Sequence, residues 1–568
     1  MALAWPSFAA AAPPLSKPQQ LTKQRAISLF LDNAKVADWL SRYPRKGRVT
    51  DATYEPDSSK CSAAAQGGCW TVHVWWKKND KVDAGEIAQG KVDDQTKTVT
   101  EAWTGPQVAW KMARGYEGAF GGKKINMVPV WLAFCIVFLL GLADVRRPLS
   151  LRNLDLLVLL SFSVSLWYFN HGNIFTSVPL AYPPLLYLLG RCVWIGRRGQ
   201  AVRASAPLWP AWILLAATVF LIGFRIGLNL EDSNVIDVGY AGVIGAQRIA
   251  SGVVPYDNFP EEDDLKACGP ADSDGEIRDR IQPNGRCESA NPLGDTYGPV
   301  AYEAYLPGYW IRGWSGKWDD LPAVHLTSIL FDVLCLVGLG LVGLRFGGPW
   351  LGAALAFAWA AFPFTQYVSM SNTNDSIVPV FLIWGFWLVS SAWARGIAVA
   401  LSGWTKFATL VVAPLWLTYP RSLPRLRPAV NFAAGFLLAT VIAFSVLLFD
   451  AHPVRAAETF YERTLETQIT RESPFSLWDW GQYHARGIPD FHVVQWILEG
   501  LLVAAALAVA FVPRTKTPLQ LAAMTGALLI GFELVLTHWF YLYIPWFFPF
   551  VAFALLATSG RAEREPAV

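Results

Sequence analysis

The stretch Trp209–Leu228, WPAWILLAATVFLIGFRIGL, decides the class of fold. A helix needs about 20 mostly apolar residues to cross a bilayer, and this stretch is long enough. Arg225 lies in its last turns, where the side chain could extend toward the membrane interface. The acidic residue Asp237 follows shortly afterwards, in what we expect to be a loop just outside the membrane. An acid in that place suggests a catalytic base that faces a lipid-borne substrate.

The composition extends this interpretation to the whole chain. Of 568 residues 53% are hydrophobic and only 16% are charged, and there are 27 Trp. These values predict an all-α polytopic membrane protein. A net charge of +3 is too balanced for a nucleic-acid-binding protein. The chain also has no glycine-rich nucleotide motif and no paired Cys-x-x-Cys for zinc, so we expect neither a nucleotide site nor a zinc site.

The apolar runs predict about eleven crossings. They lie near 128–142, 154–169, 175–195, 209–228, 325–344, 350–367, 377–394, 430–449, 493–512, 519–536 and 540–557. Basic clusters such as Arg146-Arg147 and Arg197-Arg198 separate them, and basic loops stay in the cytoplasm. This rule predicts a multi-pass protein of a bacterial plasma membrane, with Asp237 and the N-terminal region outside and the C-terminus in the cytoplasm.

The segment Gly396–Thr418 does not fit a simple crossing, because it is apolar and yet has basic residues near both ends. A re-entrant hairpin with its turn at Ser402–Lys406 resolves the conflict. Lys406 would then lie at membrane depth and face a cavity, which makes it a candidate functional residue. The alternative is that Lys406 extends to the interface from an ordinary helix.

The chain divides into four parts. Residues 1–20 are expected to be a truncated signal or leader, and residues 21–120 an extracytoplasmic α+β accessory domain. The latter combines a helical pattern at Gln24–Leu40 with alternating runs that include Trp70–Trp76, and it resembles small PepSY or cystatin-like modules. Residues 121–205 are expected to form three additional membrane helices. Residues 206–560 would form the core, with outer loops at 231–322 and 450–491.

Four cysteines lie in polar segments. In an oxidising compartment they could pair as Cys61 with Cys69 and Cys268 with Cys287, whereas free solvated thiols are the alternative.

The outer loops contain the remaining candidate site residues. Arg463 and Arg471 could bind phosphate oxygens through paired hydrogen bonds, or could form surface ion pairs with Glu462 and Glu472. His538 lies at the start of the last crossing, facing the same side as Asp237, where it is either a ligand or an interfacial spacer. The acidic run at 261–264 predicts a solvent-exposed surface.

Several motifs along the second part of the chain resemble the GT-C superfamily of polyprenyl-phosphate-sugar-dependent glycosyltransferases. The similarity is closest to glycosyltransferase family 87, of the actinobacterial α-mannosyltransferase type. The motifs are DVGYAG from Asp237, GVVPYD to Asp257, TYGPV from Thr296, SNTND from Ser371, TKFATLVVAP from Thr405, and His538. The Asn-Thr-Asn sequence and the three additional helices differ from the family pattern.

The resemblance implies an inverting transfer of a hexose from a polyprenyl-phosphate donor to an extracytoplasmic glycolipid or glycan. Mannose is the sugar typical of the family. The resemblance implies Asp237 as general base, and Lys406 and His538 as ligands of the donor phosphate. Arg463 and Arg471 are further cations available to bind that phosphate. The resemblance further implies these substrate-binding residues: Tyr240, Tyr256, Asp257, Asp295, Tyr297, Asn372 and Asn374. A divalent cation, Mg²⁺ or Mn²⁺, could be held by Asp237 with Asp257 or Asp295.

Two other classes of function stay open. A transporter or flippase of lipid-linked glycans would place Lys406 in its pathway and predicts repeated, discontinuous helices. A non-catalytic glycan-binding scaffold would keep the fold without needing Asp237.

Overall fold

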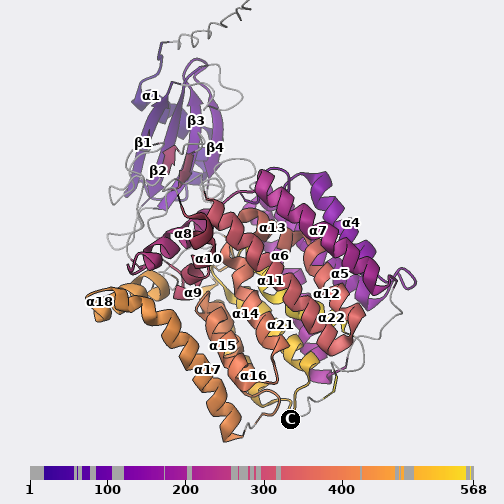
Figure 1. Cartoon of the computed structure of the whole chain (residues 1–568). Coiled ribbons are helices and arrows are strands. Elements are labelled where there is room, and N and C mark those ends of the chain that lie inside the picture. The colour runs from indigo at the N-terminus through magenta and orange to yellow at the C-terminus, as the bar shows by residue number, and fades with distance from the viewer. Residues whose placement is uncertain are drawn as a thin grey trace, which may run out of the picture. The chain divides into compact units, whose positions relative to one another are not determined.

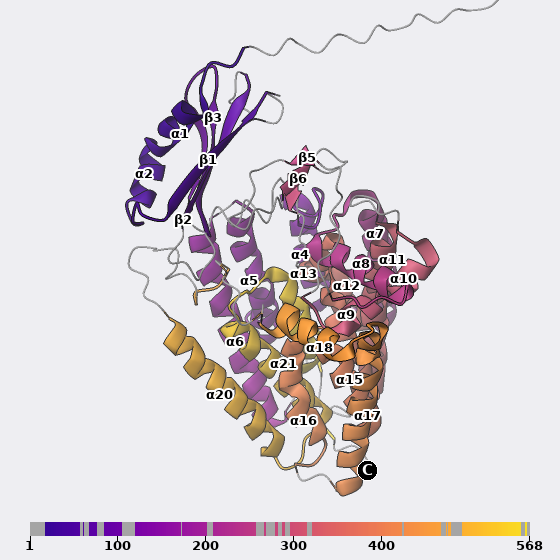
Figure 2. The same cartoon turned by 90° about the vertical axis from the view of Figure 1, so that its left-hand side faces the viewer.

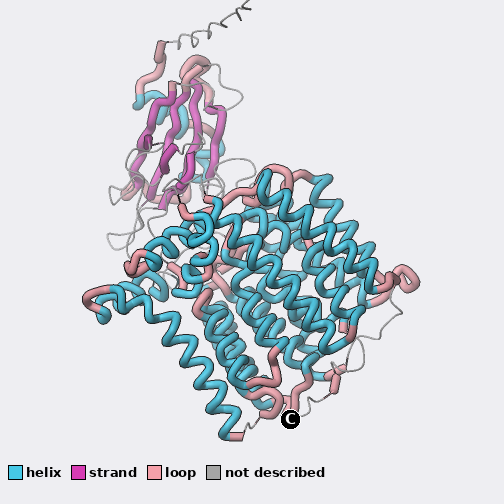
Figure 3. The backbone as a smooth tube through the Cα atoms, in the orientation of Figure 1, coloured by secondary structure: helices cyan, strands magenta, loops and turns pink. Residues whose placement is uncertain are grey.

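The structure is a computed structural model of the 568-residue chain. It describes residues 18–56, 61, 67–76, 85–104, 120–171, 173–200, 208–256, 266–267, 279–281, 287–289, 296–314, 321–422, 425–466, 468, 473, 475–478, 491–557 and 563–564. The chain separates into two compact units, one formed by residues 1–112 with 267–278 and the other by the remainder. Figure 3 colours the strands of the first unit magenta and the helices of the second unit cyan.

The N-terminal unit is a small α+β domain. Its sheet is an antiparallel meander in the order β1 (Arg48–Glu55), β2 (Cys69–Trp76), β3 (Gly85–Asp93), β4 (Val99–Thr104). The single helix expected at 24–40 is instead two, α1 (Lys23–Leu31) and α2 (Ala34–Leu40), because the Asn33 side chain caps a new helix start.

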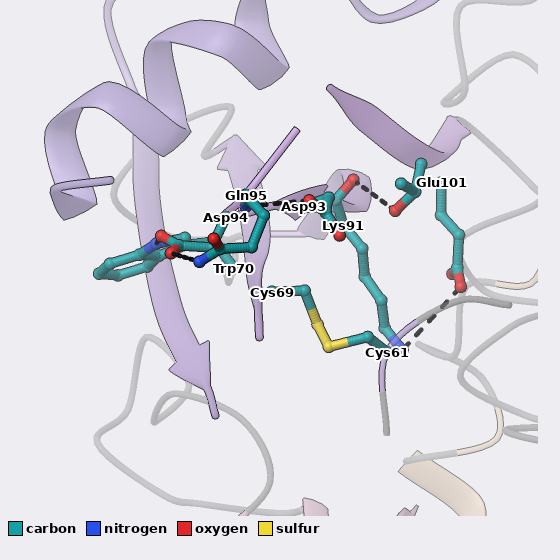
Figure 4. Close-up of a disulfide and its surroundings, with 9 residues drawn as sticks. Cys61, Cys69, Trp70, Lys91, Asp93, Asp94, Gln95 and Glu101 are labelled. Atoms are coloured by element: carbon teal, nitrogen blue, oxygen red, sulfur yellow. Dashed lines mark hydrogen bonds and ion pairs between the residues drawn. A yellow bond between two sulfur atoms is a disulfide. The ribbon is translucent and has the colours of Figure 1, made fainter. Parts of the chain in front are cut away.

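Close packing of α1 against the sheet forms the core of this unit. Phe30 is fully buried, and a Cβ on Gly90 of β3 would come within 2.3 Å of its ring, so only glycine fits there. Asp94 accepts hydrogen bonds from the backbone N–H groups of Gln20 and Leu21. It also accepts one from the indole of Trp70, which lies beside it in Figure 4. These bonds tie the segment before α1 to the sheet.

The expected disulfide Cys61–Cys69 is confirmed (Figure 4). The second expected pair is not tested, because Cys268 and the side chain of Cys287 lie outside the described residues.

The second unit is helical and identifies the chain as a multi-pass membrane protein by helix length and composition (Figure 1). Among the described residues seven helices are long and apolar enough to cross a membrane, or eight if one bent pair counts as a span. The seven are α5 (Leu151–Asn170), α6 (Ile174–Arg198), α7 (Ala211–Asp232), α11 (Pro322–Gly347), α17 (Leu426–Phe444) with η4 (Ser445–Phe449), α20 (His492–Phe511) and α21 (Pro518–Val535).

The bent pair is α12 (Pro349–Ala361) with α13 (Pro363–Ser371), whose axes differ by 54°. Pro363 causes the break, since it has no N–H to donate and forces Phe362 into an extended conformation.

Other expected crossings are shorter than a full span. The apolar helices α4 (Val128–Leu142) and α22 (Ile544–Leu556, preceded by η7, Tyr541–Tyr543) fall below the required length. The run expected at 377–394 is interrupted, because α14 (Ile377–Trp387) ends and α15 (Ala392–Gly403) begins within a few residues. By length and composition the described helices therefore support seven or eight of the about eleven crossings that the sequence predicts.

Shorter elements fill the connections. They are α8 (Asp237–Ala250), β5 (Lys266–Ala267), β6 (Asp279–Ile281), β7 (Cys287–Ser289), α9 (Pro299–Glu303), α10 (Leu306–Arg312), η2 (Asn374–Ser376), η3 (Phe407–Val412), α16 (Ala413–Leu417), α18 (Pro453–Tyr461) and the π-helical turn η5 (Glu462–Glu466). Asp237 thus begins a helix and is not in a loop, which corrects the expectation from sequence. Figure 2 shows α17 and α20 on opposite flanks of the unit, with α16 and α21 between them.

Arg225 does not extend to the interface. Its side chain is fully buried in α7 and donates to the Asp332 carboxylate at 2.6 Å, to the Trp359 carbonyl and to the Thr365 hydroxyl. The Trp359 indole donates to the same carboxylate oxygen at 2.7 Å. This pair holds α7, α11 and the break between α12 and α13 together.

The chain folds back on itself between α15 and α16. Arg395, near the start of α15, donates to the carbonyls of Trp416 and Tyr419 at the end of α16, at 3.0 and 2.7 Å. The turn follows Gly403, where a Cβ would come within 2.3 Å of the Leu410 side chain. The helical hairpin expected from sequence is therefore present, with Lys406 at its turn.

Candidate functional site

The hairpin turn brings Lys406 to Asp375. Its Nζ lies 2.6 Å from the Asp375 Oδ1, and the side chains are 10% and 1% exposed. Asp375 also accepts hydrogen bonds from the Trp546 indole at 3.0 Å and from the Thr373 hydroxyl at 2.7 Å. The carboxylate is therefore fixed by three donors from three segments of the chain, and it fixes the ammonium in turn.

Three aromatic rings surround the Lys406 ammonium. The ring centroids of Tyr297, Tyr543 and Trp546 lie 5.4, 5.0 and 5.0 Å from Nζ. Cation–π attraction at such distances stabilises a desolvated cation. The ammonium stays partly accessible, and within the described part of the chain it donates one hydrogen bond, so two of its three hydrogens can serve a ligand.

Tyr297 reaches Lys406 because its segment is docked on the hairpin turn. The Val300 N–H donates to the Trp404 carbonyl at 3.2 Å, and a Cβ on Gly298 would lie 2.0 Å from that same oxygen. The Tyr256 hydroxyl donates to the Tyr297 carbonyl, and the Tyr297 N–H donates to the Tyr302 hydroxyl, both at 3.1 Å. Two of the predicted substrate-binding tyrosines, Tyr256 and Tyr297, thus belong to one cluster.

The turn between α13 and η2 connects this cluster to α8. Asn372 adopts a left-handed conformation with φ 50°, which Asn tolerates better than most residues. Its side chain accepts from Asn229 and donates to Ser233 and to the Asn234 carbonyl. Its amide group therefore serves to hold the turn.

Asp237 is placed by the same turn. The Ile236 N–H donates to the Ser371 carbonyl at 3.3 Å, and a Cβ on Gly239 would meet the Asn372 carbonyl at 2.3 Å. Asp237 is the exposed first residue of α8, where the helix N-terminus favours a negative charge. Tyr240, one turn later, is buried against the ring of Trp314.

The other predicted phosphate ligands occupy different places. His538 forms a 2.9 Å hydrogen bond with the Ser473 hydroxyl and packs on Phe475. Arg463 is half-buried in η5. Arg471, Asp257 and Asp295 lie outside the described residues, so their predicted roles are not tested. Among the side chains that the structure describes, no group of three His, Cys, Asp or Glu residues is placed to hold a metal ion.

Buried polar atoms near Asp375 lack hydrogen-bond partners. Within the described part of the chain these are Asn374 Oδ1, Ser376 Oγ and Glu533 Oε1. The other Glu533 oxygen accepts from the Trp539 indole at 3.0 Å, and the carboxyl is close enough to Asp375 for the two to interact electrostatically. Unpaired buried acceptors are costly, so they indicate groups that a hydroxyl-rich ligand or water can satisfy.

Sequence reasoning gave no role to Asp375, Trp546, Tyr543 and Glu533. A signal existed for Asp375 and Glu533, because each is an acidic residue within or beside an apolar run. The aromatic residues carried no such signal, since the chain has 27 Trp and 18 Tyr.

Glu303, at the end of α9, is a further carboxyl on this side of the unit. Burial raises its pKa from 4.5 to about 8, so it is largely protonated at neutral pH.

Comparisons of the chain with protein-family models, with curated proteins and with solved structures found no match.

Proposed function

We propose that this protein is an integral-membrane glycosyltransferase, which transfers a hexose from a polyprenyl-phosphate-linked donor to an extracytoplasmic glycolipid or glycan with inversion. The observation that supports the proposal most is the Lys406 ammonium at the hairpin turn, held by Asp375 and three aromatic rings with two hydrogens left for a ligand. The aromatic faces suit a sugar as well as a cation, since apolar sugar faces pack on rings.

In this proposal Lys406 binds the donor phosphate and stabilises the charge that develops on it as the sugar leaves. Asp375 is a positioning residue, because it touches Lys406 and keeps the ammonium in one place. Such preorganised electrostatic contacts are worth about a hundredfold or more in rate. Arg463, Arg471 and His538 remain predicted additional ligands of the phosphate.

Asp237 is the proposed general base. An acceptor hydroxyl must lose its proton as its oxygen attacks the anomeric carbon, while the phosphate leaves from the opposite face. Inversion needs one such carboxylate. Asp237 is exposed to an incoming acceptor, and its helix is bonded to the Ser371 carbonyl, four residues before the Asp375 that holds Lys406.

The membrane arrangement is part of the proposal. About eleven crossings, with the short apolar helices included, would put the hairpin in the membrane from the cytoplasmic side as a re-entrant segment. The N-terminal unit, Asp237 and Lys406 would then face the outside of a bacterial plasma membrane. Mannose as the sugar is supported only by the family resemblance. Mg²⁺ or Mn²⁺ as an added cation is supported only by the carboxylates of Asp237 with Asp257 or Asp295 in the sequence.

A transporter of lipid-linked glycans is the second candidate, and one observation favours it. Asp375 lies between α13 and α14, and Lys406 lies between α15 and α16, so two interruptions between helices meet at this ion pair. Discontinuous helices that meet at a charged site are typical of secondary transporters. A transporter would release its lipid-linked substrate unchanged.

The test is transfer of radiolabelled mannose from polyprenyl-phosphate mannose to a lipid extract by the purified protein. Asp237→Asn should lower the rate by about a hundredfold or more while donor binding persists. Glu231→Gln is the matched control, since Glu231 is an exposed acid nearby whose ion pair with Lys124 contributes little. Equal rates for Asp237→Asn and wild type would exclude Asp237 as the base. Movement of unchanged donor across the membrane without transfer would establish the transporter instead.

A further inference from the structure

A small pocket lies in the helical unit where α4 ends and where α5 and α12 begin. It is shallow and open to solvent, and its lining includes Leu142, Asp144, Arg146, Arg152, Leu208 and Trp350. Two arginines face one carboxylate, so the lining carries a net positive charge. The site near Lys406 uses none of these residues, so binding at this pocket is independent of the proposed glycosyltransferase function.

Arg152 is the central group of the pocket. Its guanidinium lies over the Trp350 ring, 5.3 Å from the centroid. Its Nε is buried and has no hydrogen-bond partner among the residues that the structure describes. A buried donor without a partner is costly, and a guanidinium presents paired donors that match a phosphate.

Asp144 is the one acid of the lining, and the turn between α4 and α5 uses it. Its Oδ1 accepts the Arg146 N–H at 3.2 Å, while the Asn153 side chain binds the Asp144 backbone from both sides, at 2.7 and 2.9 Å. Asp144 lies close enough to Arg152 to interact with it electrostatically. It therefore shapes the wall and offsets part of the charge of the two arginines.

Helix starts add to the positive potential. Arg152 is the second residue of α5, which the Ser150 side chain caps, and Trp350 is the second residue of α12. The N-terminal ends of helices carry partial positive charge and favour anions. The arginines and the two helix starts act on the same small volume.

Three exposed leucines are neighbours of the lining residues along the chain. Leu149 is fully exposed, and Leu140 and Leu151, which directly precede the lining residues Gly141 and Arg152, are each 57% exposed. Exposed leucines next to arginines and a tryptophan are typical of a membrane interface. A free anion in water gains nothing from exposed leucines, whereas acyl chains pack against them.

We propose that this pocket binds the phosphate of an anionic phospholipid headgroup, with Arg152 as the main ligand and the three neighbouring leucines against the acyl chains. By the distribution of basic clusters, the pocket faces the cytoplasmic leaflet.

The test is binding of phosphatidylglycerol to the detergent-purified full chain, measured by native mass spectrometry. Arg152→Gln should weaken binding by about tenfold or more, because one charge-assisted contact is lost. Arg198→Gln is the matched control: Arg198 also lies over a tryptophan ring, Trp194, near another basic cluster but outside the pocket, and this change should alter binding less than about twofold.

Arg152→Lys keeps the charge, removes the paired donors and is the variant to use if Arg152→Gln does not fold. It should bind the lipid more weakly than wild type, by about threefold. Three results would overturn the proposal: equal binding of phosphatidylglycerol by wild type and the Arg152 variants, equally strong binding of phosphatidylcholine, or displacement of the lipid by millimolar inorganic phosphate, which would indicate a site for a soluble anion.

Discussion

Two ion pairs in the helical unit have almost the same partners and different surroundings. In each, a basic side chain lies 2.6 Å from an aspartate Oδ1 that also accepts a tryptophan indole N–H. Arg225 has no exposed surface and donates to two backbone carbonyls and a hydroxyl besides Asp332. Lys406 is partly exposed, donates to Asp375 alone among the described residues and otherwise faces three aromatic rings.

The difference shows how to separate structural from functional charge within a membrane protein. The Arg225 guanidinium donates through both terminal nitrogens to groups of the fold and so holds helices together, and only its Nε has no partner among the described residues. An ammonium with unused hydrogens, beside buried oxygens that lack partners, is arranged for something that the protein alone does not supply. Substitutions in the two pairs and their surroundings test this distinction.

Arg225→Met should destabilise the protein by about 3–5 kcal/mol, because it leaves the Asp332 carboxylate buried without its cation. Thermal unfolding in detergent measures the effect. The double variant Arg225→Met/Asp332→Leu removes both charges and should recover much of the loss. Normal stability of the single variant would contradict a structural role for the pair.

Lys406→Met should lower sugar transfer by about a hundredfold or more with the protein still folded. The double variant Lys406→Met/Asp375→Asn should regain stability lost by the single variant but no activity, because the phosphate ligand is still missing. Lys124→Met, which removes an exposed lysine paired with Glu231, is the control and should leave transfer unchanged. Activity of the double variant at the wild-type level would assign Lys406 to structure.

Glu303 extends the comparison to a buried carboxyl for which the described residues offer no cation. Its pKa is about 8 in the fold against 4.5 for the free group, so the native state binds its proton more tightly than the unfolded state. Stability should therefore fall as pH rises from about 4.5 to about 8 and change no further above that range. Glu303→Gln should raise stability by about 2 kcal/mol at pH 8.5, less than the full linkage value because the side chain is partly exposed, and by little at pH 4.5. Unfolding curves at the two pH values check this, and an equal gain at both would contradict it.

The two indoles give the smallest effects. Trp359→Phe removes one hydrogen bond to Asp332 and should cost about 1 kcal/mol of stability, with little change in KM. Trp546→Phe should cost a similar amount and also raise the KM for the donor about threefold, since a weaker hold on Asp375 loosens Lys406. Equal effects of both changes on KM would show that the indoles do not distinguish the two pairs.

The sequence predicted the class of the protein and much of its local structure. The length of the apolar runs in the sequence predicted the positions of the seven long helices. The basic residues near both ends of Gly396–Thr418 predicted the hairpin and the place of its turn. Seven or eight of the about eleven predicted crossings are long, apolar helices in the structure. Apolarity along the chain did not reveal where helices break, as at Leu388 or Phe362. The sequence also placed Asp237 in a loop, although α8 begins there.

The sequence by itself therefore determined the membrane class, the small N-terminal α+β unit and Lys406 as a residue of interest, because these depend on composition and on neighbours along the chain. The structure decided between the Cys61–Cys69 disulfide and free thiols. Only the tertiary structure decided which charges meet. Asp375 and Lys406 are 31 positions apart and Trp546 is 171 from Asp375, while Arg225 and Asp332 are separated by 107. A charge away from water is costly unless an opposite charge lies close to it in space. The periodicity of the sequence does not show which distant residues come that close.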